Sequence, residues 1–154
     1  TAAGRQLALH VLRRHRLIEQ FLVQVMGMDW SRVHAEADRL EHAVSDELVD
    51  RMDELLGRPA VDPHGDPIPD RQGVVSEPQR PSLAACPVDV PLRVARVTDQ
   101  SSEFLQLVER HGLMPGSEVT VAGRDAAADT VRLRLTGRRR LELGLRAASK
   151  ILVE

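Results

Sequence analysis

The chain has 154 residues, of which 42% are hydrophobic and 29% are charged, so it can bury the core of one ordinary domain or of two small ones. Its formal net charge is −2, with acids and bases interspersed, which excludes a global basic field that would hold nucleic acid or an anionic membrane. A single cysteine, Cys86, excludes a disulfide framework and a thiolate metal cluster within one chain, and favours a cytoplasmic protein.

The first 57 residues are expected to form three helices. Apolar residues recur at helical spacing over residues 7–25. Asp29 or Ser31 can cap a second helix, whose apolar side runs over residues 33–44. A third helix is expected over residues 45–57, because it opens with a serine followed by two acids, which favour a helix N-terminus.

The remainder of the chain divides into a proline-rich stretch and a segment with the period of β-strands. Prolines from residue 58 to residue 91 favour loop and linker, because proline lacks an amide donor and restricts its neighbours. Residues 91–154 alternate apolar and polar side chains, as half-buried antiparallel strands do. We therefore predict an α+β chain with a helical domain at residues 1–69, a linker at 70–90 and a small β-barrel domain at 91–154.

The second expected helix carries four possible metal ligands in a stretch of nine residues: His34, Asp38, Glu41 and His42. At about 100° per residue they share one face, which borders the apolar side of the helix. Such a position is half-buried. An imidazole and a carboxylate one helical turn apart can chelate a divalent cation.

The first expected helix carries a matching pair, His15 and Glu19, again four residues apart and beside apolar positions. If the two helices pack by their apolar sides, His15, Glu19 and His34 form one site, and the other three ligands of the second helix form another. Nitrogen and oxygen donors without thiolate suit first-row divalent ions, and sets rich in carboxylates favour Mn²⁺ or Fe²⁺.

Other interpretations of these residues remain open. A histidine four residues from an acid is often only a surface ion pair, although two helices with the same pair favour metal. A metalloenzyme would need a general base, for which no residue has suitable spacing, so we predict no catalytic residue and no enzyme. A metal-independent dimerisation or adaptor module is the other alternative. His10, His64 and His111 lack acidic neighbours of this kind and are expected to be ordinary polar residues.

Longer motifs accompany these ligands. "R-x-H-R-L-x-E", "G-M-D-W-x-x-V-H-x-E-A-x-R-L-E-H-x-x-S-D-E" and "P-H-G-D-P-I-P" occur within residues 1–69, and "HGLMPGSEVTVAGR" follows near the C-terminus. Together they resemble the diphtheria toxin repressor family of metal-dependent transcriptional regulators, which includes the iron-dependent (IdeR) and manganese-dependent (MntR-type) repressors. The resemblance implies a metal-binding and dimerisation domain followed by an SH3-like (FeoA-like) domain.

The resemblance also implies site residues and a metal. An ancillary site would take His15, Glu19 and His34, with Gln100 and Glu103 of the SH3-like domain, and a primary site would take Asp38, Glu41 and His42. Iron regulators of this family have cysteine where this chain has Asp38, so the carboxylate favours Mn²⁺ over Fe²⁺. Co²⁺, Zn²⁺, Cd²⁺ and Ni²⁺ are expected to substitute in vitro.

The implied function is a metal-dependent repressor of metal-uptake genes that acts as a homodimer, without membrane contact. Candidate interface residues, with a role in the internal core as the alternative, are Trp30, Val44, Leu48, Met52 and Leu55. Family members place a winged-helix DNA-binding domain ahead of the segment that begins this chain. We therefore expect a fragment that dimerises and binds metal, does not bind operator DNA by itself, and lacks one ligand of its primary site.

Overall fold

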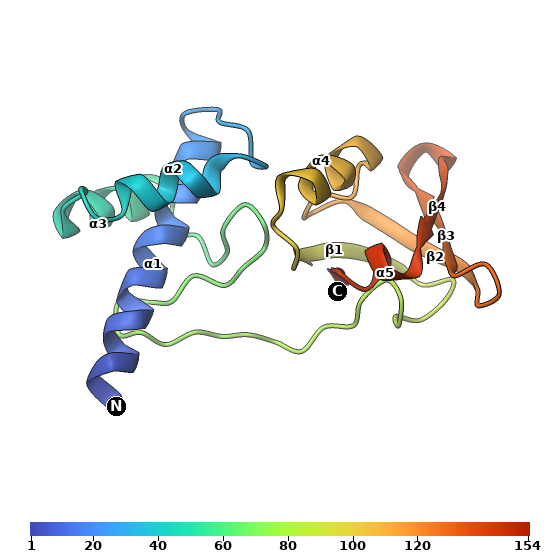
Figure 1. Cartoon of the computed structure of the whole chain (residues 1–154), viewed down its shortest axis with the longest axis horizontal. Coiled ribbons are helices and arrows are strands. Elements are labelled where there is room, and N and C mark those ends of the chain that lie inside the picture. Colours follow the sequence, from blue (N-terminus) through green and yellow to red (C-terminus); the bar gives the residue numbers. More distant parts are fainter. The chain divides into compact units, whose positions relative to one another are not determined.

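The computed structural model describes residues 1–154, which form two compact units, Thr1–Pro78 and Gln79–Glu154 (Figure 1). We call them the helical unit and the sheet unit. Helices build the first, and a five-stranded antiparallel sheet builds the second, so the α+β prediction is confirmed. No helix is both long and apolar enough to cross a membrane.

The helical unit contains α1 (Ala2–Gln24), α2 (Val33–Leu40) and α3 (Asp46–Leu55). In Figure 1, α2 and α3 cross the C-terminal half of α1, and the first turns of α1 extend beyond them. Ser45 caps α3 as expected, because its side chain accepts a hydrogen bond from the amide of Leu48.

The second helix is shorter than its apolar pattern predicts. It ends at Leu40, and residues 41–44 form a turn in which the amides of Ala43 and Val44 both donate to the Leu40 carbonyl. The cap at Ser45 starts a new helix directly afterwards, so the chain must turn before it. Neither expected cap acts at the other end of α2: the Asp29 carboxylate accepts from the amide and hydroxyl of Ser31 and closes a turn ahead of the helix.

The three helices pack by their apolar sides. Ile18 and Leu22 of α1 lie against Val33 and Ala37 of α2, and all four side chains are buried. A second cluster joins α1 to α3 and the following loop through Leu17, Val49 and Ile68. Burial of each large apolar side chain stabilises the unit by about 1.5–3 kcal/mol, so this packing determines how α1 and α2 face one another.

The sheet unit contains five strands in the order β4-β3-β2-β1-β5, and every neighbouring pair is antiparallel. The strands are β1 (Pro91–Val97), β2 (Glu118–Asp125), β3 (Thr130–Leu135), β4 (Arg140–Gly144) and β5 (Ile151–Val153). Two helices, α4 (Ser102–His111) and α5 (Leu145–Ala148), and a short 3-10 helix, η1 (Thr136–Arg138), complete it. Alternate residues of β2, β3 and β5 are buried, as the period of two predicts, whereas in β1 an irregularity after Val94 leaves the buried Val94 and Val97 three residues apart.

Part of the expected linker belongs to the sheet unit. The amide of Val153 donates to the Pro81 carbonyl, and the amide of Leu83 donates to the Ile151 carbonyl, each at 2.9 Å. Leu83 and Cys86 are buried, and Arg124 donates to both of their carbonyl oxygens. Prolines indicate a loop, but they do not reveal that its few apolar side chains fill a core.

A buried ion pair between α1 and α3 supplies a test of stability. Arg13 and Asp53 are both buried, and Arg13 Nη2 lies 2.9 Å from Asp53 Oδ2. We expect Asp53→Ala to lower the free energy of unfolding by about 3–5 kcal/mol, because it removes the one buried carboxylate that lies within hydrogen-bond distance of a buried guanidinium. Asp50 lies 3.8 Å from the same guanidinium and is half-exposed, so Asp50→Ala should cost less than about 1 kcal/mol. Equal losses in urea-induced unfolding would contradict this.

Candidate metal centre

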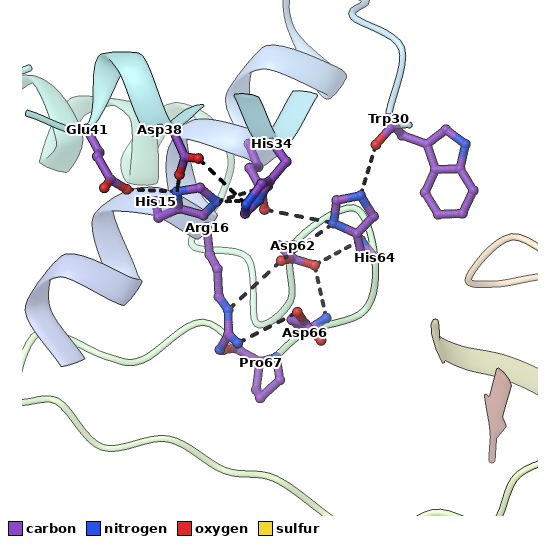
Figure 2. Close-up of polar contacts among 11 residues, drawn as sticks. His15, Arg16, Trp30, His34, Asp38, Glu41, Asp62, His64, Asp66 and Pro67 are labelled. Atoms are coloured by element: carbon purple, nitrogen blue, oxygen red, sulfur yellow. Dashed lines mark hydrogen bonds and ion pairs between the residues drawn. The ribbon is translucent and has the colours of Figure 1, made fainter. Parts of the chain in front are cut away.

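Three side chains from two helices converge at the α1–α2 contact. His15 and Glu19 stand one turn apart on α1, and His34 stands in the first turn of α2. The packing of Ile18 and Leu22 against Val33 brings the two helices together here. Figure 2 shows His34 on one side of the His15 ring.

The three donor atoms form a nearly equilateral triangle. His15 Nε2 lies 3.1 Å from Glu19 Oε1 and 3.0 Å from His34 Nδ1, and His34 Nδ1 lies 3.0 Å from Glu19 Oε1. Neighbouring ligands of an octahedral ion with bonds of about 2.1 Å lie about 3.0 Å apart. The spacing therefore fits three adjacent ligands of one divalent cation.

Hydrogen bonds cannot account for all three contacts. Each ring nitrogen carries at most one hydrogen, and an ionised carboxylate carries none. Three hydrogen bonds along the three sides of the triangle would need three hydrogens, but the two nitrogens supply at most two. If both nitrogens are protonated, their hydrogens point toward each other across the contact between His15 Nε2 and His34 Nδ1. On at least one side of the triangle, two lone pairs or two hydrogens therefore face each other and repel. A cation shared by the three atoms would remove that repulsion.

The other nitrogen of His15 faces a second set of carboxylates. His15 Nδ1 lies 2.7 Å from Glu41 Oε2 and 3.3 Å from Asp38 Oδ1, and Figure 2 shows both acids on this side of the ring. One atom from each of His15, Asp38 and Glu41 lies within 4.8 Å of the others, close enough for a second cation. The structure thus gathers Asp38 and Glu41 around His15.

His42, the third residue of the expected primary site, lies at the edge of this set. Its Nε2 is 3.2 Å from Glu41 Oε1, and its side chain is 79% exposed. Because α2 ends at Leu40, His42 sits in the turn and leaves the helical face on which the sequence placed it. Its role as a ligand stays a prediction, as do those of Gln100 and Glu103, which lie in the sheet unit just before and within the first turn of α4.

His64 was not expected to contribute. The expectation that it lacks acidic neighbours is wrong: it is fully buried, and its Nδ1 lies 3.8 Å from Glu19 Oε2 and 3.9 Å from Asp62 Oδ2. Its Nε2–H donates to the Trp30 carbonyl at 2.9 Å (Figure 2). Glu19, Asp62 and His64 make a third group that could hold a cation.

A local signal could have identified His64. In "DPHGD", acids stand two residues before and two residues after the histidine. The carboxylate of Asp62 accepts hydrogen bonds from the amides of His64 and Asp66, so the loop folds around its own acid. This turn directs the imidazole inward.

The charges around His15 favour its cationic form when no metal is bound. Burial alone would lower the pKa of His15, but hydrogen bonds and charge from Glu19 and Glu41 outweigh it and raise that pKa from 6.5 to about 9. Burial pushes the pKa of Glu19 upward, while the hydrogen bond and charge of His15 bring it below its ordinary value. The metal-free centre therefore holds a proton that a metal must displace.

Two family models match the chain. Residues 1–70 match the iron dependent repressor, metal binding and dimerisation domain, and residues 82–154 match the FeoA domain. The iron-dependent repressor IdeR of Mycobacterium tuberculosis is 37% identical over 133 residues, which cover 79% of this chain and 58% of that protein. The diphtheria toxin repressor of Corynebacterium diphtheriae is 35% identical over 136 residues, covering 81% of this chain and 60% of that protein. The chain thus spans less than two thirds of these relatives' lengths.

Solved structures are similar over nearly the whole chain. A manganese-dependent transcriptional repressor in complex with manganese has 41% identity and a TM-score of 0.90, covering 99% of this chain and 72% of that one. ScaR with bound Zn²⁺ has 34% identity and a TM-score of 0.84, covering 100% of this chain and 76% of that one.

The raised pKa of His15 predicts how the stability of the metal-free chain depends on pH. A folded-state pKa above the ordinary 6.5 means that the contribution of His15 is complete below pH 6.5 and is lost as the pH rises through about 9. Urea-induced unfolding with a chelator present should show the free energy of unfolding falling over this interval. His15→Gln should flatten most of the fall, and an unchanged fall in that variant would contradict the assignment.

Proposed function

We propose that residues 1–154 are the metal-sensing and dimerisation part of a metal-dependent transcriptional repressor. The chain belongs to the diphtheria toxin repressor family of such repressors. The convergence of His15, Glu19 and His34 on one point carries the proposal. In the whole protein, operator DNA would be bound by a winged-helix domain outside residues 1–154, and metal-uptake genes would be repressed when the ion is plentiful. A cytoplasmic location and the absence of an enzymatic role are part of this proposal.

Mn²⁺ is the metal that the donor set favours, with Fe²⁺ as the alternative. The two sets around His15 contain imidazoles and carboxylates only, and the second set is rich in carboxylate, which suits harder divalent ions. The relatives include manganese-dependent and iron-dependent repressors, and ScaR holds Zn²⁺ or Cd²⁺ in its solved forms. We propose that Gln100 and Glu103 complete the ancillary set and that His42 completes the primary set.

The chain's residues can convert metal binding into added stability of the contact between α1 and α2. A bound divalent cation would supply positive charge to donors from α1 and α2 at once. His15 and Glu19 would then hold α1 against His34, and the imidazolium proton of His15 would leave to solvent. Because only the arrangement in which α1 packs on α2 presents all donors, binding stabilises that arrangement over any other.

Single substitutions should separate the donors of the triangle from those of the second set. Titration with Mn²⁺ by isothermal calorimetry should show that His15→Ala and His34→Ala each lose at least the upper part of the range of about 10–100-fold that is typical when a group that only orients a ligand is removed, because each removes a donor of the triangle itself. Asp38 is half-exposed and lies outside the triangle, so Asp38→Ala should lose about tenfold or less. His10, near Asp46 on the other side of α1, supplies the control His10→Ala.

The same titration separates the proposed function from its alternatives. No binding of Mn²⁺, Fe²⁺, Co²⁺ or Zn²⁺ by the unaltered chain would favour a metal-independent adaptor module. Hydrolytic turnover with a bound metal would favour an enzyme. Equal losses in the His15, His34 and Asp38 variants would contradict the division into two sets.

The proposed dimer surface lies on α3 and the turn before it. Leu48 and Leu55 are 48% and 68% exposed, and with the half-buried Met52 they recur at helical spacing along one side of α3. Val44 adjoins them, also half-buried. Trp30 is buried inside the helical unit, where its ring stacks on His64 with centroids 5.5 Å apart, so it serves the internal core.

Charged substitutions should test this surface. We expect the double variant Leu48→Asp, Leu55→Asp to be monomeric in light scattering at concentrations where the unaltered chain is dimeric, because carboxylates cannot be buried unpaired in an interface. Arg39→Asp, at an exposed position on α2 away from this surface, is the control and should leave the dimer intact. A monomeric unaltered chain, or loss of the dimer in the control alone, would count against the assignment.

A further inference from the structure

The residue that precedes His15 makes a set of contacts that metal ligation does not explain. Arg14 is on α1, and its side chain is only 12% exposed. Its Nη2 donates to the Glu41 carbonyl at 2.8 Å, and its Nε donates to the same oxygen at 3.2 Å. The guanidinium also donates to the Val44 carbonyl and to the Asp46 carboxylate.

These contacts give hydrogen-bond donors to carbonyl groups at the C-terminal end of α2. The last carbonyl groups of an α-helix have no partner in their own helix, and α2 ends just before Glu41. A cation at this position supplies the missing donors and interacts favourably with the negative end of the helix dipole. Arg14 thus ties the C-terminus of α2 to the first turn of α3, where Asp46 stands.

Glu41 is held twice by adjacent residues of α1. Arg14 binds its main-chain carbonyl, and His15 Nδ1 lies 2.7 Å from its carboxylate. The main-chain contacts fix where the turn of residues 41–44 lies, and the side-chain contact then requires Glu41 to reach back to His15. His42 is in the same turn, so its position depends on the same contacts.

We propose that Arg14 is a positioning residue for the set formed by His15, Asp38 and Glu41, and that it acts without touching the metal. This inference rests on the proposed metal-binding function. Arg14 is assigned to this set only, because the triangle of His15, Glu19 and His34 takes no donor from the turn of residues 41–44.

Two backgrounds isolate the two sets for the test. His34→Ala leaves the set of His15, Asp38 and Glu41, whereas Asp38→Ala leaves the triangle. In the His34→Ala background, Arg14→Gln should lower the affinity for Mn²⁺ about 10–100-fold, the range typical of groups that orient ligands. In the Asp38→Ala background, the same change should alter affinity about threefold or less, because all three donors of the triangle stand on α1 and α2, and only the contact from His15 Nδ1 to Glu41 joins the triangle to the turn.

The direction of the effect separates positioning from simple electrostatics. Removal of a positive charge beside a cation site should by itself strengthen cation binding. A weaker site after Arg14→Gln therefore requires loss of geometry. Arg14→Lys keeps the charge but can donate to fewer carbonyl oxygens at once, so it should give an intermediate affinity.

Controls identify which contact matters. Asp46→Asn removes the ion pair of Arg14 but leaves both carbonyl contacts, and should change Mn²⁺ affinity little. Arg39→Gln removes an exposed arginine of α2 that binds only Glu36 in this structure, and matches the change in charge. Circular dichroism and urea unfolding with a chelator should show each variant folded before titration.

The outcomes distinguish failure of this inference from failure of the proposed function. Absence of Mn²⁺ binding by the unaltered chain would overturn the proposed function. If that chain binds Mn²⁺, then equal losses from Arg14→Gln in both backgrounds, no loss in the His34→Ala background, or no Mn²⁺ binding in that background with Arg14 present would each overturn the role of Arg14.

Discussion

The contact on which the centre depends is the approach of His15 Nε2, His34 Nδ1 and Glu19 Oε1 to about 3 Å from one another. Three electron-rich atoms this close need positive charge between them, either protons or a metal ion. The apolar packing of α1 on α2 holds them together regardless of that charge. The core therefore prepares a site whose stability depends on what occupies it, as the proposed sensing of metal requires.

His15 is the residue that joins the two sets of donors. Its Nε2 faces the triangle, and its Nδ1 faces Glu41 and Asp38. An imidazole that gives one nitrogen to a metal usually donates its other N–H to an acceptor, and this second contact orients the ring. Glu41 can thus act as the acceptor for the triangle and as a ligand of the adjacent set, so occupancy of one set must influence the other.

Sequence periodicity was enough to predict three helices followed by strands, and the apolar sides by which α1 and α2 pack. The spacing of four between His15 and Glu19, and the apolar stripe beside them, predicted the side of α1 that meets α2. Periodicity could not predict that α2 ends at Leu40, because the turn that follows joins the Ser45 cap of α3 and accepts hydrogen bonds from Arg14, a residue far away in the sequence. It also could not place His64, whose partners Glu19 and Trp30 lie in other elements. The sequence motifs suggested which residues share a site, but the atoms that meet depend on tertiary packing.

The turn at residues 41–44 connects the metal centre to the proposed dimer surface. It carries Glu41 at one end and leads through Val44 into α3, on which Leu48 and Leu55 are exposed. If metal binding changes the conformations available to this turn, it changes the free energy of association through α3. Linkage then requires that dimerisation change the affinity for metal by the same factor. A centre shared by two helices and the turn into a third is therefore suited to couple metal concentration to assembly, whereas a site within one helix would leave the other elements unaffected.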